Sequence, residues 1–342
     1  MPQEAVCTAP FQLEWRSYSD DPVLGTGQVR IQAEFAAAKH GTELALYGGA
    51  VTERGHWDAA LGVFNHQQPE AVFPLGIGNM VVGRVQQVGP GVARLKQGDR
   101  VACYGSFKPT HTLAESECWQ MPESMPWQSA VCLDPADFAL GALRDAELRL
   151  GDSVAIFGLG AIGLMAVQMA RLSGASTIVA IDPLAARRDV ARELGATHAL
   201  NPREEDVGLR LKQLCDGKGP DVAIEYSGSS QALQAALRGV AFRGTVVFGA
   251  FAPPFGAGLD LGAEAHMNVP RVVFSRANSE PQRDYPRWNN QRIYQTCFDM
   301  LADGRLTGQG IVSEPVPFES VLDAFASAVK EPGKVIKLGV RF

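Results

Sequence analysis

A glycine-rich turn between a predicted strand and a predicted helix constrains the fold of this chain more than any other feature. Residues 153–157 are apolar and mostly β-branched or aromatic, which is typical of a buried parallel strand. Residues 164–172 predict a helix with no breaker, and a second apolar strand is expected at 177–181. Between the first strand and the helix lies a G-x-G-x-x-G turn, which predicts a dinucleotide-binding unit: Gly158, Leu159, Gly160, Ala161, Ile162 and Gly163.

Each glycine of this turn has a physical role. Gly158 permits the tight turn out of the strand, Gly160 lets a pyrophosphate approach the backbone, and Gly163 lets the helix pack close to the sheet. The free amides and the positive dipole end of the helix then bind the phosphates. The alternative is a chance glycine-rich turn in another α/β protein, and the surrounding strands and helix argue against it.

Asp182 ends the second predicted strand, roughly 20 residues beyond the turn, where such units place the acid that binds the adenosine ribose. Its carboxylate accepts hydrogen bonds from both ribose hydroxyls and repels a 2′-phosphate, which favours NAD over NADP. Arg187 and Arg188 lie close behind and favour the opposite choice.

The bulk composition excludes several function classes. The chain has 342 residues, of which 46% are hydrophobic, and this is enough for two domains with their own cores. A net charge of −6 gives no electrostatic reason to bind nucleic acid or an anionic membrane. Its N-terminus shows no secretion signal and no apolar run reaches membrane-spanning length. The scattered cysteines, without a C-x-x-C pair, predict reduced, mostly buried thiols and a cytoplasmic protein.

The chain divides into two regions that differ in their predicted secondary structure. Short strand-like segments such as 28–33, 81–88 and 100–104 predict a β-rich, partly barrel-like domain over residues 1–144. Residues 145–277 alternate strands and helices, which predicts a Rossmann-type, doubly wound parallel sheet with further strands at 222–226, 244–248 and 271–274. We expect residues 278–342, with a helix at 291–301 and a strand at 335–340, to return and complete the first domain. This organisation predicts an active site in the cleft between the two domains.

Two of these predicted strands end beside further cofactor candidates. Ligands bind at the carboxyl ends of parallel strands, so the residues after 222–226 and after 244–248 are expected to contact the cofactor. They are Ser227, Gly228, Gly249, Ala250 and Phe251.

Residues 83–92 and the Gly98-Asp99-Arg100-Val101 run resemble the medium-chain dehydrogenase/reductase superfamily, and the resemblance covers essentially the whole chain. It implies a GroES-like catalytic domain ahead of the Rossmann domain, and a homodimer or homotetramer paired through the edge of the nucleotide-binding sheet. Stretches 39–43, 75–83, 132–135, 264–266 and 274–288 resemble a finer branch, the bacterial guloside 3-dehydrogenases. That branch implies NAD-linked oxidation of the C3 hydroxyl of a hexopyranoside, or the reverse reduction, in carbohydrate catabolism.

The same resemblance raises the question of a catalytic zinc. The positions that carry zinc ligands in the superfamily are His40, Asn79, Met80 and Asp134 here, and an amide and a thioether bind zinc poorly. The cysteine-rich structural zinc lobe is also missing, since residues 101–121 hold two separated cysteines. We expect a zinc-free site. The alternative is a weak metal site formed by His40, Asp134 and Glu43.

Without a metal, a side chain must take the hydroxyl proton as hydride leaves. His40 is the first candidate for this base, with Asp134 orienting its ring, and Lys39 is either an alternative base or a donor to the developing alkoxide. The resemblance implies a proton relay through Thr42. The plainer alternatives are a solvated Lys39 and a hydrogen-bonded core histidine at position 40.

A glycoside pocket needs carboxylates, amides and an aromatic face. The candidates are Glu43, Asn79, Asp137, Glu264, His266, Asn278 and Trp288. Asp284, Arg287 and Trp288 can equally form a rigid surface loop, and His111 can face either the cleft or solvent. Three functions stay open at this point: an NAD-dependent glycoside dehydrogenase, a zinc-dependent polyol or alcohol dehydrogenase, and a nucleotide-binding homologue without turnover.

Overall fold

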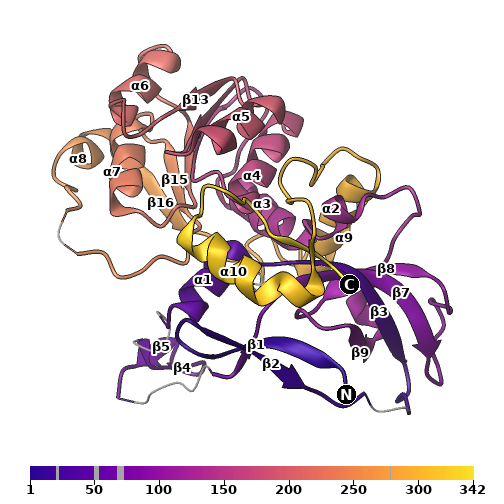
Figure 1. The fold of residues 1–342 in the computed structure, drawn as a ribbon. Helices are drawn as coiled ribbons and strands as arrows, with labels where there is room; N and C mark the ends of the chain where they lie inside the picture. Colours follow the sequence, from indigo (N-terminus) through magenta and orange to yellow (C-terminus); the bar gives the residue numbers. More distant parts are fainter. Residues whose placement is uncertain (21–22, 50–53, 68–72, 257, 278) are drawn as a thin grey trace. The chain divides into compact units, whose positions relative to one another are not determined.

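The computed structural model describes residues 1–20, 23–49, 54–67, 73–256, 258–277 and 279–342. Its backbone contacts divide the chain into two compact units (Figure 1). The first unit combines Met1–Val131 with Val312–Phe342, and the second unit is the continuous segment Cys132–Ile311. The chain therefore leaves the first unit, completes the second and returns.

The first unit is built on antiparallel sheets around the long strand β3 (Gln28–Ala37). Strand β3 pairs on one side with β7 (Met80–Val88) and on the other with β18 (Gly339–Arg341) from the returning segment. The remaining strands are β1 (Gln3–Ala9), β2 (Gln12–Ser17), β4 (His56–Asp58), β5 (Val63–Asn65), β6 (Leu75–Gly76), β8 (Arg100–Tyr104), β9 (Thr110–Ala114), β10 (Cys118–Gln120) and β17 (Val316–Pro317).

Alternation along β3 builds the core of this unit, because successive side chains point to opposite faces. Val29, Ile31 and Ala33 are buried in one cluster with residues of β7, β8 and the returning segment. Helix α10 (Val321–Lys330) adds Phe325, whose ring lies 5.6 Å from that of Tyr47 in α1 (His40–Tyr47). The other helical segments of this unit are α2 (Trp127–Ala130), η2 (Glu115–Glu117) and η3 (Phe318–Ser320).

The second unit is a parallel sheet in the order β13-β12-β11-β14-β15-β16. Its strands are β11 (Ser153–Phe157), β12 (Thr177–Ile181), β13 (His198–Leu200), β14 (Val222–Glu225), β15 (Thr245–Phe248) and β16 (Arg271–Phe274). Its helices are α3 (Leu133–Asp145), α4 (Ala161–Leu172), α5 (Ala185–Glu193), α6 (Val207–Leu214), α7 (Ser230–Gly239), α8 (Glu264–Asn268) and α9 (Asn290–Ala302), several of which are visible beside the sheet in Figure 1. The order of strands reverses between β11 and β14, and ligands bind at such a switch point.

The predicted strands of the sheet are confirmed, and β11, β12 and β16 have the predicted bounds. Strand β14 ends one residue early and β15 begins one residue late. The last predicted strand, 335–340, is shifted: Lys337 makes an isolated parallel bridge with Val312, and regular pairing begins only at Gly339.

The borders of the compact units also differ from the predicted borders at 144/145 and 277/278. They fall at Val131/Cys132 and Ile311/Val312, because α3 packs against α4 and α9 packs against α3. These two helices therefore belong to the nucleotide-type sheet, and only residues 312–342 return to the first unit.

Candidate active site

The glycine-rich turn has the geometry that its sequence requires. Gly158 has φ +86°, and a Cβ there would lie 2.7 Å from the backbone nitrogen of Ser227. A Cβ on Gly163 would lie 2.0 Å from the carbonyl oxygen of Gly158. Helix α4 begins at Ala161, with Gly160 as its N-cap. No larger residue fits at 158 or 163 without moving the backbone.

Asp182 is fixed beside this turn at the end of β12. Its side chain is only 4% exposed, and Oδ2 accepts a hydrogen bond from the backbone nitrogen of Leu159 at 2.9 Å. Oδ1 accepts from the backbone nitrogen of Leu184 at 2.8 Å, and Arg187 Nη1 lies 3.7 Å from Oδ2. Each carboxylate oxygen keeps a second acceptor position. The acid is therefore held rigidly next to the glycine-rich turn.

A cavity of about 600 Å³ opens at this edge of the sheet. Its lining brings together residues that follow three different strands: Gly158 after β11, Asp182 after β12 and Ser227 after β14. This volume is within the range of small-molecule sites. Sequence reasoning missed several lining residues, among them Arg203 and Ser229, because they lie in no recognisable motif.

Glu225 is a further residue that sequence reasoning missed. It ends β14, is fully buried, and accepts hydrogen bonds from the backbone nitrogen of Ser227 at 2.6 Å and that of Gly228 at 3.1 Å. The Ser227 hydroxyl donates to the same carboxylate. Burial raises the pKa of Glu225, and these donors oppose the rise. Because Ser227 packs directly on Gly158, the Glu225 carboxylate sets the wall of the cavity.

The predicted residues after β15 lie beside this wall. The backbone nitrogen of Gly249 donates to the carbonyl oxygen of Glu225 at 2.9 Å, and a Cβ on Gly249 would lie 2.7 Å from the ring of Tyr226. Ala250 is half-buried and Phe251 is exposed.

In the first unit, the predicted catalytic residues open helix α1. Lys39 is its N-cap, His40 is its first residue and Thr42 is partly exposed in the first turn. The side chain of His40 lies outside the described part of the structure. The buried Glu43 accepts hydrogen bonds from the backbone nitrogens of Lys39 and Gly78, one with each carboxylate oxygen. These two hydrogen bonds hold the Glu43 carboxylate in place, and its predicted metal or substrate contact stays a prediction.

Two of the four positions that carry zinc ligands in the superfamily hold poor zinc donors here. Met80 is fully buried in the core, and Asn79 offers an amide whose Nδ2 is buried without a hydrogen-bond partner among the described residues. Within the described ranges, no three His, Cys, Asp or Glu side chains gather in a way that could hold a metal ion. We therefore derive no chemical step through zinc.

Asp134 and Asp137 lie one turn apart on α3 of the second unit, and both side chains are buried. Burial, together with the negative charge of Asp137, raises the pKa of the Cys297 thiol well above its ordinary value. The predicted partnership of Asp134 with His40 joins residues of different units and stays a prediction. All six cysteines are free and buried, as predicted.

His111 faces neither solvent nor a described cavity. Its side chain is buried, Nε2 donates to the carbonyl oxygen of Lys108 at 3.1 Å, and its ring packs against Gly105. Burial and the nearby Lys108 ammonium lower the pKa of His111 to about 4. This histidine is neutral at pH 7 and is part of the core.

The predicted substrate residues beyond position 263 are engaged elsewhere or lie outside the description. Glu264 forms a 3.0 Å ion pair with Arg238, and His266 is exposed on α8. The Trp288 ring stacks on two guanidinium groups, those of Arg144 at 3.6 Å and Arg292 at 4.2 Å from the ring centroid. Asn278 is not among the described residues. The Trp288 ring is therefore a structural anchor of its loop.

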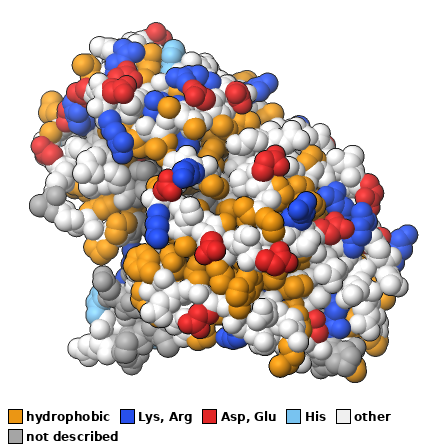
Figure 2. Space-filling view, in the orientation of Figure 1, with side chains coloured by type: hydrophobic (Ala, Val, Ile, Leu, Met, Phe, Trp, Pro, Cys, Tyr) orange, Lys and Arg blue, Asp and Glu red, His pale blue; other side chains and the backbone are white. Residues whose placement is uncertain are grey.

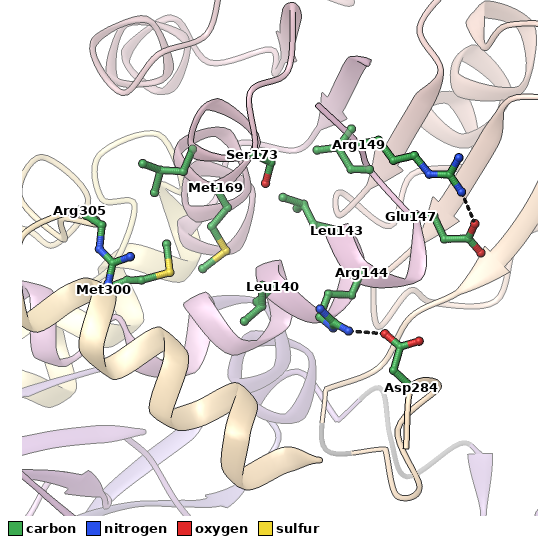
Figure 3. A pocket seen from close by; sticks show the side chains of 12 residues that line it. Leu140, Leu143, Arg144, Glu147, Arg149, Met169, Ser173, Asp284, Met300 and Arg305 are labelled. Carbon is green, nitrogen blue, oxygen red and sulfur yellow. Dashed lines mark hydrogen bonds and ion pairs between the residues drawn. The ribbon is translucent and has the colours of Figure 1, made fainter. Parts of the chain in front are cut away.

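A larger cavity of about 740 Å³ lies elsewhere in the second unit (Figure 3). Apolar side chains of α3, α4 and α9 line it, including Leu140, Met169 and Met300. Its charges are paired, since Arg144 binds Asp284 at its rim. The glycine-rich turn does not line it, whereas Gly158 of that turn lines the smaller cavity.

Comparison with known proteins identifies the family. Residues 25–157 match the family model described as alcohol dehydrogenase GroES-like domain, and residues 161–285 match that described as zinc-binding dehydrogenase. The chain is 40% identical to the D-guloside 3-dehydrogenase of Escherichia coli over 99% of this chain and 100% of that protein. The chain belongs to the zinc-type medium-chain dehydrogenase family.

More distant relatives of this medium-chain dehydrogenase share its architecture. The sorbitol dehydrogenase of Bacillus subtilis is 26% identical, over 78% of this chain and 81% of that protein. The crystal structure of 2R,3R-butanediol dehydrogenase from Bacillus subtilis has a TM-score of 0.80 at 21% identity, with both chains fully covered. The predicted GroES-like domain and Rossmann-type sheet are thus confirmed. The protein is an oxidoreductase that acts on a CH–OH group.

The surface of this medium-chain dehydrogenase agrees with a small-molecule substrate. On the face drawn in Figure 2, Lys and Arg side chains are interspersed with Asp and Glu side chains. A nucleic-acid partner needs a continuous basic face, and this face does not supply one. Among the described residues, no helix is both long and apolar enough to cross a membrane.

Proposed function

We propose that this protein uses NAD to oxidise the C3 hydroxyl of a hexopyranoside, such as a D-guloside or D-glucoside, to the 3-keto glycoside, or performs the reverse reduction. The full-length 40% identity to D-guloside 3-dehydrogenases carries this proposal. The cavity beside Gly158 and Asp182 supports it, since it presents a turn and an acid suited to a dinucleotide.

In this proposal, different residues perform different parts of the reaction. NAD, when bound, supplies the hydride acceptor. The glycine-rich turn and the start of α4 would hold its pyrophosphate, and Asp182 would accept hydrogen bonds from the ribose hydroxyls. His40 takes the hydroxyl proton as the C–H electron pair leaves and the C=O bond forms. Lys39 donates to the developing alkoxide, Thr42 relays the proton, and Asp134 orients the base.

The choice of NAD over NADP depends on Asp182. Both neighbouring arginines are turned toward this residue: Arg187 contacts its carboxylate, and Arg188 donates to its carbonyl oxygen at 2.7 Å. The charge of Arg187 is thus partly neutralised by the carboxylate, and Arg188 is held by a backbone carbonyl oxygen. A 2′-phosphate beside Asp182 would meet a fixed negative charge.

We further propose that the protein is a cytoplasmic homodimer or homotetramer paired through β16. This edge strand exposes Val272 by 46% and Phe274 by 78%, and α8 beside it exposes Met267 by 72%. An exposed apolar edge strand is a template for pairing with another chain. Sedimentation of the purified protein tests the proposed oligomer. Val272→Lys should shift the sedimenting species toward the monomer.

NADH production, followed by absorbance, tests the activity. The substrates are methyl D-gulosides and methyl D-glucosides, beside sorbitol and ethanol, with NADP as the matched cofactor control and metal content measured on the same preparation. Turnover on the glycosides supports the proposal. The 3-ketone product would acidify the adjacent ring C–H, which would suit a following catabolic step. Turnover on open-chain alcohols alone, with stoichiometric zinc, would replace it with a polyol or alcohol dehydrogenase.

A further inference from the structure

A buried lysine is the least expected side chain of the first unit. Lys337 is only 2% exposed, and its Nζ donates a hydrogen bond of 2.6 Å to the carbonyl oxygen of Ala38. These residues are 299 positions apart in the chain. Burial of an ammonium is costly unless it is hydrogen-bonded and compensated by charge.

The carbonyl that Lys337 contacts belongs to the peptide group that joins Ala38 to Lys39. The N–H of that same peptide group donates to Oε2 of Glu43. A cation therefore lies at its oxygen and an anion at its nitrogen, each at the end where the peptide dipole favours it. The other carboxylate oxygen of Glu43 accepts from Gly78, the residue before Asn79.

We infer that Lys337 and Glu43 form a clamp across the Ala38–Lys39 peptide group and thereby position Lys39 and His40 for the reaction. This inference rests on the proposed function, because it assigns the pair to the same catalytic turn. Neither side chain acts on the substrate; both are positioning residues. The returning segment thus delivers an ammonium to the start of α1.

Stability alone does not account for this arrangement. Two apolar side chains of similar volume would hold a buried site at least as well as these two charged ones, since neither would have to be desolvated. The charges instead fix the orientation of one peptide group, because each forms a directional hydrogen bond with it. A displacement of about 1 Å of a catalytic group can cost about a hundredfold in rate.

The test compares Lys337→Met with a matched control, Lys334→Met. Lys334 lies three residues earlier, is 67% exposed and pairs with Glu331 at the surface. We expect Lys337→Met to lower kcat about a hundredfold with the NAD dissociation constant nearly unchanged, and to lower the thermal midpoint because the buried Ala38 carbonyl oxygen loses its donor. Lys334→Met should leave all three unchanged, and Lys337→Arg should recover part of kcat because it keeps the cation.

A double-mutant cycle tests the coupling of the two residues. Glu43→Gln keeps the shape of the side chain but places an NH2 group against one backbone N–H. This variant should also lower kcat about a hundredfold. The double variant should lose about a hundredfold, not the product of the two losses. Multiplicative losses, or a loss of kcat that follows the unfolded fraction, would overturn the clamp.

Amide hydrogen exchange of residues 38–47 separates this inference from the proposed function. Faster exchange there in Lys337→Met than in Lys334→Met, with the second unit unchanged, supports the clamp even if no glycoside is oxidised. Unchanged exchange would overturn it even if the wild-type protein oxidises glycosides readily. The absence of glycoside turnover in the wild type counts against the proposed function alone.

Discussion

The two units position their candidate functional residues in different ways. In the second unit, backbone geometry positions most of the candidate residues: a positive φ at Gly158, a helix start at Ala161, and Asp182 and Ser227 just after strands β12 and β14. In the first unit they depend on a side-chain network in which Glu43 and Lys337 hold one peptide group. A backbone site tolerates changes around it, whereas a network of buried charges depends on each member.

The largest expected effect is on the chemical step in the first unit. His40→Ala and Lys39→Met should each lower kcat by roughly a thousandfold, as expected for loss of a general base or an alkoxide donor. NAD affinity should stay within about twofold, because the residues proposed to hold NAD belong to the second unit. Stopped-flow rates and a fluorescence titration with NADH measure the two quantities. Equal losses in both would show that the units are not separable in this way.

A second prediction concerns the stability of the first unit against acid. The pKa of His111 is about 4 in the folded protein and 6.5 in the unfolded chain, so the unfolded chain binds more protons between these values. Stability from this residue is complete above pH 6.5 and is lost as pH falls toward 4, by about 3 kcal/mol. Urea unfolding at pH 7 and pH 4 should show this loss in the wild type.

His111→Gln, which keeps a donor for the Lys108 carbonyl oxygen, should lose less stability over the same range. His56→Gln is the matched control, because His56 is exposed on β4. If His111→Gln and the wild type lose the same amount, the histidine is not a neutral core residue.

A third prediction addresses cofactor choice in the second unit. Asp182→Asn keeps the shape but loses the charge, and it should raise the KM for NAD about thirtyfold, since hydrogen bonds to a charged group are worth roughly 2 kcal/mol. The KM for NADP should change less or fall. The control is Asp189→Asn on α5, whose carboxylate makes only a surface pair with Arg192. Equal losses for both cofactors would contradict the assigned role.

The smallest expected effect tests how firmly the backbone site depends on a buried side chain. Glu225→Gln replaces one acceptor of the Ser227 and Gly228 N–H groups with an NH2 group, and should weaken NAD binding about tenfold. Isothermal titration calorimetry measures this, with kcat at saturating NAD as the control. A loss of kcat without a loss of affinity would mean that the loop acts on the chemistry instead.

The difference between the units also explains what the sequence could predict. The glycine-rich turn, its flanking strands and Asp182 were predictable because local spacing specifies them. The partners of Glu43 and Lys337 were not, because no local pattern shows which carbonyl lies beside a lysine 299 residues away. Trp288 was expected at the substrate for its residue type, yet its ring stacks on arginines from α3 and α9.

The split of the first unit has a consequence for the order in which the protein matures on the ribosome. The second unit is continuous and has all its strands once residue 311 has emerged. The Ala38–Lys39 peptide group, by contrast, waits for Lys337, which is synthesised almost 300 residues later. Under the proposed function, a nascent chain would bind dinucleotide before the start of α1 is set, and oxidation would begin only after Lys337 has been added.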